Sequence, residues 1–153
     1  MSCGTLRLVT RMKYDDISWH YGGEFPADLP RSAAGIHIGM FVTWATLAGL
    51  GGELHAFEFP DFVKQLKDRT ILPGVFLETV CDGKLTSEDL SSEGNAFARA
   101  YFDSDENRYI NDYVIALADN LPTVYHVEDS WESFDLIAPL IKQRLEEWQK
   151  QRA

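Results

Sequence analysis

The segment from residue 33 to residue 50 is apolar at most of its positions, and it constrains the fold more than any other part of the sequence. At helical spacing, one face of it would carry His37, Phe41, Trp44 and Ala48. That face is flanked by further apolar side chains, namely Ile36, Met40 and Leu47. A helix that is apolar most of the way round has to be covered on all sides. The segment therefore predicts a central, buried helix, capped by Ser32 and ending at about Leu50 in the glycine-rich "GLGG".

The other patterns are also mainly helical. A second helix is predicted over 60–70, two helical runs over 92–119, and a last helix over 133–149, in which Pro139 either kinks the helix or marks its first turn. Residues 72–80 fit a short helix or a strand, and residues 121–129 fit a short extended segment. We therefore expect a mainly α fold, a single compact domain of five to six helices, with at most a short β-hairpin.

A chain of 153 residues has room for one domain. Recognisable pattern begins at Lys13, so we expect a single globular domain over residues 12–150, with an N-terminal extension or alternative start over residues 1–11. The two cysteines, Cys3 and Cys81, are too few for a disulfide framework. The N-terminus lacks the apolar region of a secretion signal, and no apolar run reaches the about 20 residues of a membrane-spanning helix. These features predict a soluble, cytoplasmic protein.

The formal net charge is −10, and the pI is near 4.7. Phosphate groups would be repelled, so nucleic acids and anionic membrane surfaces are poor partners for this chain. A basic protein or a cationic ligand fits the charge better, although solubility alone is a sufficient reason for it. The sequence does not fix an oligomeric state.

The stretch from residue 12 to residue 44 gathers the residues best suited to chemistry. The adjacent carboxylates Asp15 and Asp16 can bind a metal ion or transfer protons, or they can accept backbone hydrogens in a turn. The loop that follows contains Trp19, His20, Tyr21, Gly22 and Gly23. It forms either the rim of a binding pocket or an ordered cover across the central helix. The residues assigned to the loop and core are Trp19, Gly22, Gly23, His37 and Trp44, whereas those expected to stay exposed are Asp15, Asp16, His20 and Tyr21.

Motifs for catalysis are absent from the sequence. It has no GxSxG or SxxK nucleophile motif and no glycine-rich phosphate loop, so we assign no catalytic residue and do not expect an enzyme. The four histidines show no HxxxH or HExxH spacing, and we predict no bound metal or cofactor. One alternative stays open, a small enzyme or a ligand- or metal-binding protein. Its site would assemble in space from His20, His37, His55 and either Asp15 or Asp16.

Several acidic segments contain aromatic residues. Such segments are either solvated surface or a docking face for a basic partner, in which aromatic side chains anchor the complex and charge speeds association. The residues that we assign to partner binding are Asp15, Asp16, His20, Tyr21, Asp103, Asp105, Glu106, Tyr109, Tyr113, Glu128, Asp129 and Trp131.

The motif "KYDD-SWHYGG-FP-DLP", followed by "HIGMF--W", resembles a family of small acidic bacterial proteins that is largely uncharacterised. The later segments "SDENRYINDY" and "VEDSWESFD" are also similar to that family, so the resemblance covers most of residues 13–148. Proteins of this kind resemble immunity proteins that neutralise antibacterial toxins. The resemblance implies an intracellular protein that binds and occludes a cognate toxin, which is basic if it is a nuclease but need not be so in other classes. It transfers no catalytic residue.

Overall fold

The computed structural model describes residues 12–21 and 25–152, and the central helix predicted from the sequence is present in it. Helix α2 (Ile36–Leu47) follows a 3₁₀ turn over Arg31–Gly35, and all of its residues up to Ala45 are buried. The helix ends where Gly49 adopts a φ of 83°, a conformation open to a residue without a side chain. Ser32 lies inside the 3₁₀ turn, so the prediction that it caps the helix was wrong.

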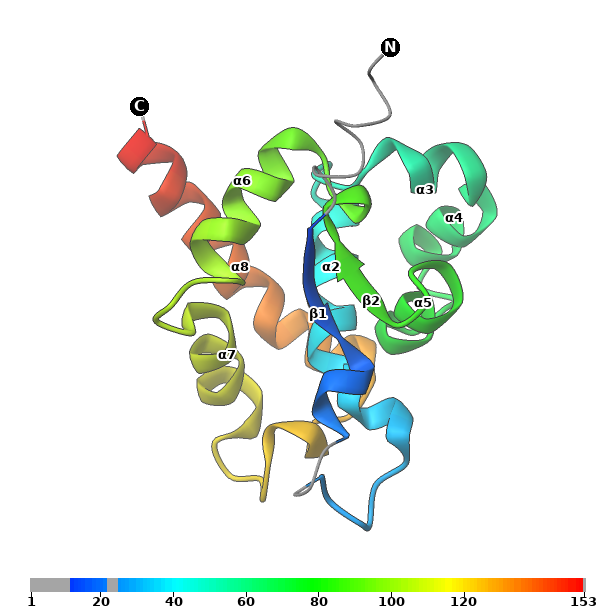
Figure 1. Ribbon diagram of the computed structural model, residues 1–153, viewed down its shortest axis with the longest axis vertical. Coiled ribbons are helices and arrows are strands. Elements are labelled where there is room, and N and C mark those ends of the chain that lie inside the picture. Colours follow the sequence, from blue (N-terminus) through cyan, green and yellow to red (C-terminus); the bar gives the residue numbers. More distant parts are fainter. Residues whose placement is uncertain (1–11, 22–24, 153) are drawn as a thin grey trace.

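A two-stranded antiparallel sheet lies across α2 (Figure 1). Strand β1 (Lys13–Asp16) pairs with β2 (Lys84–Thr86), which places Asp15 opposite Leu85. The register shifts between the first and third residues of β1, and such a bulge breaks the alternation of inward and outward side chains. Tyr14, Asp15 and Asp16 are therefore all buried. A short sheet is confirmed, but its two strands lie far apart in the sequence and do not form a hairpin.

Three helices lie on one side of α2 (Figure 1), namely α3 (Glu53–Glu58), α4 (Pro60–Asp68) and α5 (Pro73–Val80). The prolines of α4 and α5 stand in the first turn, where the missing N–H has no helical partner to lose. Helix α5 packs along α2, and Gly39 of α2 allows the backbone of Pro73 and Gly74 to come close. The segment that fitted either a helix or a strand is therefore a helix, and α3 is a helix that the sequence did not predict.

On the other side of α2 lie α6 (Ser92–Tyr101) and α7 (Arg108–Tyr113), which continues as a π-helix over Val114–Ala118 (Figure 1). The last helix, α8 (Trp131–Arg152), packs against α2, α6 and α7. Stacked and tilted aromatic rings fill the space between these elements, namely Phe41, Phe97, Tyr101, Phe102 and Tyr109.

Helix α8 is also fixed by a buried polar contact with α7. The guanidinium of Arg144 donates to both oxygens of Asp112, from Nε at 2.9 Å and from Nη2 at 3.1 Å. The Tyr101 hydroxyl donates to the same carboxylate at 2.7 Å. Because the carboxylate is satisfied by one charged and one neutral donor, it can be buried among the aromatic rings.

The fold class is confirmed as mainly α in a single compact domain, with seven α-helices in the described part of the chain where five or six were expected. One local prediction was wrong, because residues Val124–His126 form a 3₁₀ turn capped by Thr123 in place of an extended segment. Pro139 lies inside α8, well after its start at Trp131, so of its two alternatives the first turn is excluded and the kink stays a prediction. Within residues 12–21 and 25–152, none of the helices combines the length and the apolar character needed to cross a membrane.

The close contact at Gly39 predicts a large loss of stability in the Gly39→Ala variant. The added Cβ would lie 2.6 Å from the carbonyl oxygen of Pro73 and 2.9 Å from Cα of Gly74, and neither backbone atom can move without shifting α5. We expect the free energy of unfolding in urea to fall by about 2–3 kcal/mol. The exposed Ala56→Ser variant should change it by less than about 0.5 kcal/mol, and equal effects in the two variants would contradict this packing.

Candidate functional site

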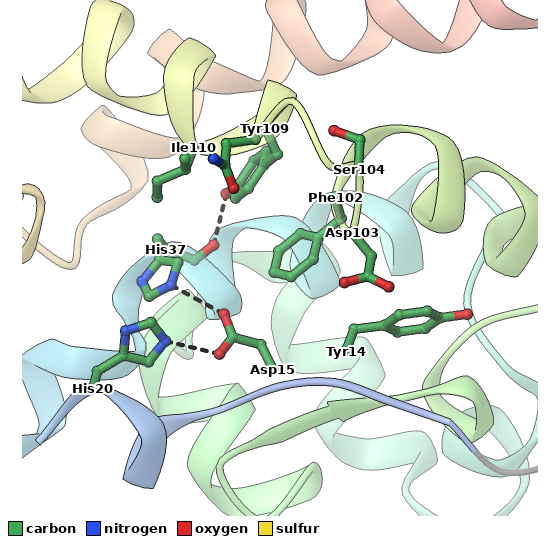
Figure 2. A pocket seen from close by; sticks show the side chains of 10 residues that line it. Tyr14, Asp15, His20, His37, Phe102, Asp103, Ser104, Tyr109 and Ile110 are labelled. Carbon is green, nitrogen blue, oxygen red and sulfur yellow. Dashed lines mark hydrogen bonds and ion pairs between the residues drawn. The ribbon is translucent and has the colours of Figure 1, made fainter. Parts of the chain in front are cut away.

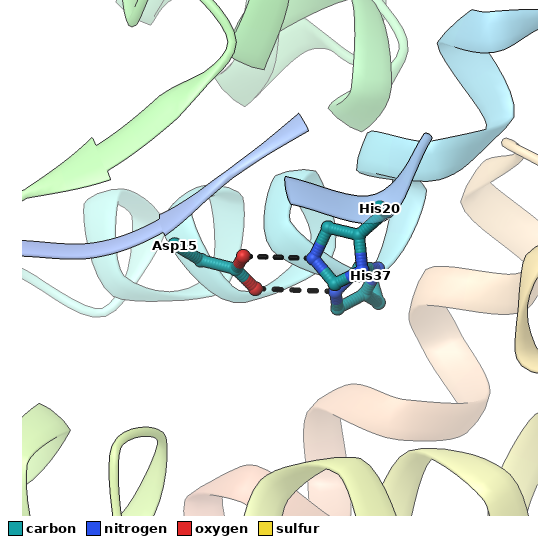
Figure 3. A group of neighbouring side chains, drawn as sticks. All are labelled: Asp15, His20 and His37. Carbon is teal, nitrogen blue, oxygen red and sulfur yellow. Dashed lines mark hydrogen bonds and ion pairs between the residues drawn. The ribbon is translucent and has the colours of Figure 1, made fainter. Parts of the chain in front are cut away.

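One buried carboxylate contacts two imidazole rings in the interior of the fold. Figure 3 shows each oxygen of Asp15 directed at one ring: Oδ1 lies 2.8 Å from Nε2 of His20, and Oδ2 lies 3.3 Å from Nε2 of His37. The two rings meet edge to face, with centroids 4.8 Å apart. Since an ionised carboxylate can only accept, Nε2 of each ring carries the donated hydrogen. We call Asp15, His20 and His37 the Asp–His cluster.

Three local structures in the first third of the chain bring the Asp–His cluster together. Asp15 points inward because the bulge in β1 turns it away from solvent. His20 ends a 3₁₀ turn over Ile17–His20 that begins at Asp16, whose carboxylate accepts the backbone N–H of Ser18 at 2.9 Å. His37 stands in the first turn of α2, where the packing of the whole helix fixes it. Asp16 therefore has the capping role that was one of its two sequence interpretations, and Asp15 alone enters the cluster.

The second nitrogen of His20 also has a partner. Its Nδ1 lies 2.7 Å from the hydroxyl of Tyr125, a residue of the 3₁₀ turn before α8. With His20 neutral, this hydroxyl donates to Nδ1, so the ring is held at both ends. The sequence placed Tyr125 in an acidic segment suited to docking a partner and did not connect it with His20. The two residues are 105 positions apart, and no local pattern connects them.

The Asp–His cluster lines a cavity of about 260 Å³. Figure 2 shows the two imidazoles and Asp15 along one side of this pocket, with Phe102 and Asp103 facing them. The remaining lining residues are Tyr14, Ser104, Asn107, Tyr109 and Ile110. A cavity of this kind has room for a small polar ligand or a group of ordered waters next to the cluster.

The pKa shifts define the charge state of the cluster. Burial alone would raise the pKa of Asp15, but the hydrogen bonds from His20 and His37 outweigh it and hold that pKa far below its usual range. Burial lowers the pKa of His37, and the hydrogen bond to Asp15 offsets only part of this effect. At neutral pH the cluster therefore combines an ionised carboxylate with a neutral imidazole at His37, the forms in which both groups bind cations.

The rest of the cavity is also negative. Burial, together with the nearby charges of Asp105 and Asp15, raises the pKa of Asp103. Three carboxylates, those of Asp15, Asp103 and Asp105, are thus close enough to affect one another at this cavity. The arrangement therefore favours a cationic guest over an anionic one.

The residues that we assigned to partner binding differ in how exposed they are to solvent. Four of these residues are carboxylates exposed to solvent, where a partner could contact them. They lie on the loop between α6 and α7 and near the start of α8, namely Asp103, Asp105, Glu106 and Glu128. The expectation that Asp15 and Asp16 stay exposed was wrong, because the bulge in β1 turns both inward. Tyr109 and Tyr113 are 1% and 0% exposed, so they pack in the core and cannot anchor a partner.

The other assigned residues are half-buried and engaged within the protein. Tyr21 lies under the guanidinium of Arg31, and Asp129 accepts the backbone N–H of Gly74 at 2.9 Å. The indole of Trp131 donates from Nε1 to a backbone carbonyl at 3.1 Å. These three side chains have structural contacts that a partner would have to share or replace.

Of the residues assigned to the loop and core, some are buried as expected and one is exposed. His37 and Trp44 are buried on α2, as expected. Trp19 is 56% exposed, with the amine of Lys13 over its ring, so the prediction that it packs on the central helix was wrong. Its 3₁₀ turn directs His20 inward and leaves Trp19 on the outside. Gly22 and Gly23 lie outside the described residues.

His55 was grouped with His20 and His37 in the sequence-based metal alternative, but it lies elsewhere. It is buried on α3 and contacts Asp89 through Nε2 at 2.7 Å. Sequence spacing could not separate the two groups, because each assembles from elements that are distant in the chain.

Comparison with protein families shows a match over residues 13–127 to a family described as a domain of unknown function, DUF7832. The match includes the whole Asp–His cluster and Tyr125. Comparison with curated proteins and with solved structures gave no match.

The charge state of the Asp–His cluster predicts how stability depends on pH. The pKa of His37 is below its unfolded value of 6.5, so the unfolded chain binds a proton that the folded chain does not. Asp15 acts in the same direction below about pH 5, because its pKa is also lowered by folding. The free energy of unfolding should therefore fall between about pH 7 and pH 4.

Urea unfolding at each pH, with EDTA present so that no ion competes with protons, measures this slope. The His37→Gln variant should flatten it between about pH 7 and pH 5. The control is the exposed Ala56→Ser variant, which removes no ionisable group and should leave the slope unchanged. If His37→Gln keeps the wild-type slope, His37 does not titrate in this way.

Proposed function

Because the chain belongs to the DUF7832 family, whose function is unknown, we propose its function from the site itself: a divalent transition-metal ion binds to Asp15, His20 and His37 and holds a small ligand in the adjoining cavity. One observation carries the proposal. Two imidazole nitrogens and one carboxylate from three separate elements converge, with all ligand atoms within 4.8 Å of one another.

The distances within the Asp–His cluster fit a shared ion. Neighbouring ligand atoms around zinc, with bonds of about 2.1 Å, are roughly 3.0–3.4 Å apart. The two N···O separations of 2.8 and 3.3 Å are close to this range. An ion-free protein satisfies the same distances with two hydrogen bonds, and metal loading distinguishes the two states.

The surroundings of the cluster also support an ion. When Nε2 of His20 binds the metal, its hydrogen moves to Nδ1 and is donated to the Tyr125 hydroxyl, which can accept as well as donate. A hydrogen bond of this type fixes the ring of a metal-bound histidine and raises its basicity. The ionised Asp15 and the neutral His37 can bind the ion without first losing a charge-bearing proton.

Three protein ligands leave at least one coordination position unfilled. Two histidines and one carboxylate suit zinc, manganese or iron(II), and the unfilled position of such a site is where water or substrate binds. In this fold that position would face the cavity, with Asp103 and Ser104 across from it. The proposed ion would therefore be accessible to a small ligand.

Metal analysis tests the proposal. Protein without a histidine tag, loaded with Zn²⁺ and dialysed, should contain about one equivalent more metal than the Asp15→Asn or His37→Gln variant treated in the same way. Zn²⁺ should also raise the melting temperature of the wild type and not that of the variants, because only the folded site binds it.

The matched control removes a histidine–aspartate pair at the surface. His126→Gln deletes the imidazole that lies 3.0 Å from Asp28, and its metal content should equal that of the wild type. Equal metal content in the wild type and in both cluster variants would refute the metal site. Circular dichroism confirms that each variant is folded before it is compared.

A second candidate function is supported by the exposed acidic loop: an immunity-type protein in the cytoplasm that occludes a cognate antibacterial toxin. Asp103, Asp105 and Glu106 are exposed side by side between α6 and α7, in a chain of net charge −10. Burial raises the pKa of Asp103, and the nearby charges of Asp105 and Asp15 add to the shift, so part of it comes from the negative charge around the loop. Such a surface attracts a basic partner and speeds its association.

Charge removal on this loop tests the immunity role. A triple variant with Asp103→Asn, Asp105→Asn and Glu106→Gln should lose protection when it is co-expressed with a toxin domain encoded beside its gene, because it lacks the docking charge. The control variant, with Glu58→Gln, Asp61→Asn and Asp119→Asn, removes the same charge from exposed positions elsewhere and should still protect. If both variants still protect, or if both fail to protect, docking through this loop is contradicted.

A further inference from the structure

A second group of metal-binding side chains lies away from the Asp–His cluster. Nε2 of His55 is 2.7 Å from Oδ1 of Asp89 and 3.8 Å from Sγ of Cys81. All three residues are buried, and their ligand atoms lie within 4.8 Å of one another. They come from α3, from the residue that ends α5, and from the 3₁₀ turn after β2. We call them the Cys–His–Asp cluster.

Thiol, imidazole and carboxylate together are a donor set that suits zinc. Zinc accepts sulfur, nitrogen and oxygen ligands and imposes little geometry of its own. Sulfur and nitrogen on a tetrahedral zinc ion are roughly 3.6 Å apart, near the 3.8 Å between Sγ of Cys81 and Nε2 of His55. The 2.7 Å contact between His55 and Asp89 is shorter than the roughly 3.4 Å expected for nitrogen and oxygen ligands, so this pair would open slightly.

The carboxylate of Asp89 is already oriented for such a role. Its Oδ2 accepts the backbone N–H of Thr86 at 2.7 Å, as part of the capping box that starts the 3₁₀ turn. This leaves Oδ1 directed at His55. A ligand carboxylate that is hydrogen-bonded through its other oxygen is the usual arrangement at protein metal sites.

Hydrogen bonding within the protein does not satisfy both nitrogens of the His55 ring. His55 is 2% exposed, and its Nδ1 has no partner among the described residues. His20, in contrast, uses both ring nitrogens. Burial of His55 is thus explained only in part by its pair with Asp89.

Charge balance favours an ion at this position. A buried carboxylate needs a compensating charge close by. Zn²⁺ bound by a thiolate, a carboxylate and a neutral imidazole gives a cluster with no net charge. An ion pair of protonated His55 with Asp89 also sums to zero, but it uses the Cys81 thiol only as a hydrogen-bonding group beside Asp89 and His55.

We propose that His55, Cys81 and Asp89 hold a second, structural zinc ion, enclosed by the protein and independent of the ion proposed at Asp15, His20 and His37. With three protein ligands, a water molecule would complete the four-coordinate shell. The ion would tie α3 to the end of α5 and to the turn after β2. Because the cluster is enclosed, the metal would enter while the chain folds.

Cobalt(II) distinguishes this site from the first one. Co²⁺ bound to a thiolate gives a charge-transfer absorption in the near ultraviolet, and the Asp–His cluster contains no sulfur. Full-length protein refolded from urea with Co²⁺ under reducing conditions should show this band. The band should be lost in Cys81→Ser and His55→Gln, and it should persist in Asp15→Asn, whose substitution lies in the other cluster.

The matched control is Cys3→Ser, which removes the other cysteine and should leave the band unchanged. Zinc content should fall by about one equivalent in Cys81→Ser, which exchanges only sulfur for oxygen, and should stay at the wild-type value in Cys3→Ser. A wild type that refolds without the band, or a folded Cys81→Ser variant with wild-type zinc content, would overturn the second site. Since the cobalt band reports only on sulfur, this result is independent of whether the Asp–His cluster binds metal.

Discussion

The fold depends on one constraint, the burial of α2 on every face from Ile36 to Ala45. A helix with apolar side chains on every face is stable in water only when other elements cover all of it. Here α5 packs along it through Gly39, the two strands cross it, and α8 and the aromatic rings of α6 and α7 close the remaining side. Each of these elements is amphipathic or short, and none has a comparable core of its own. The domain is therefore organised around one helix, not around a sheet.

The same burial creates the candidate site. His37 is a polar residue on the apolar helix, and a buried imidazole needs a hydrogen-bond partner. Asp15 supplies it, and the bulge in β1 is what turns Asp15 inward. Asp15 in turn needs a second donor, which His20 provides, and His20 is completed by Tyr125. Because each buried polar group needs a hydrogen-bond partner, residues from four separate parts of the chain come together beside a cavity.

The two clusters differ in how they meet solvent, and this difference suggests different roles. The Asp–His cluster lines a cavity, so a ligand can reach it, as in metal sites that act on small molecules. The Cys–His–Asp cluster is buried on all sides, as in metal sites that stabilise a fold. Burial and the nearby charge of Asp89 raise the pKa of Cys81, so without a metal this thiol is unreactive at neutral pH. The exposed acidic loop adjoins the first cluster, because Asp103 also lines its cavity, whereas Asp105 and Glu106 face solvent.

The sequence by itself determined the helical class and the burial of α2, since periodic apolar patterns report which sides of a helix avoid water. It also indicated the residues of the Asp–His cluster as an alternative. It could not show that Asp15 and not Asp16 joins the histidines, because a single register shift in β1 decides that. Nor could it show that Tyr109 and Tyr113 are core residues, since an acidic neighbourhood in sequence is compatible with a buried helix face. Only the tertiary structure brought Tyr125 to His20 and Cys81 to His55, because contacts between distant elements depend on how whole helices pack and not on local spacing.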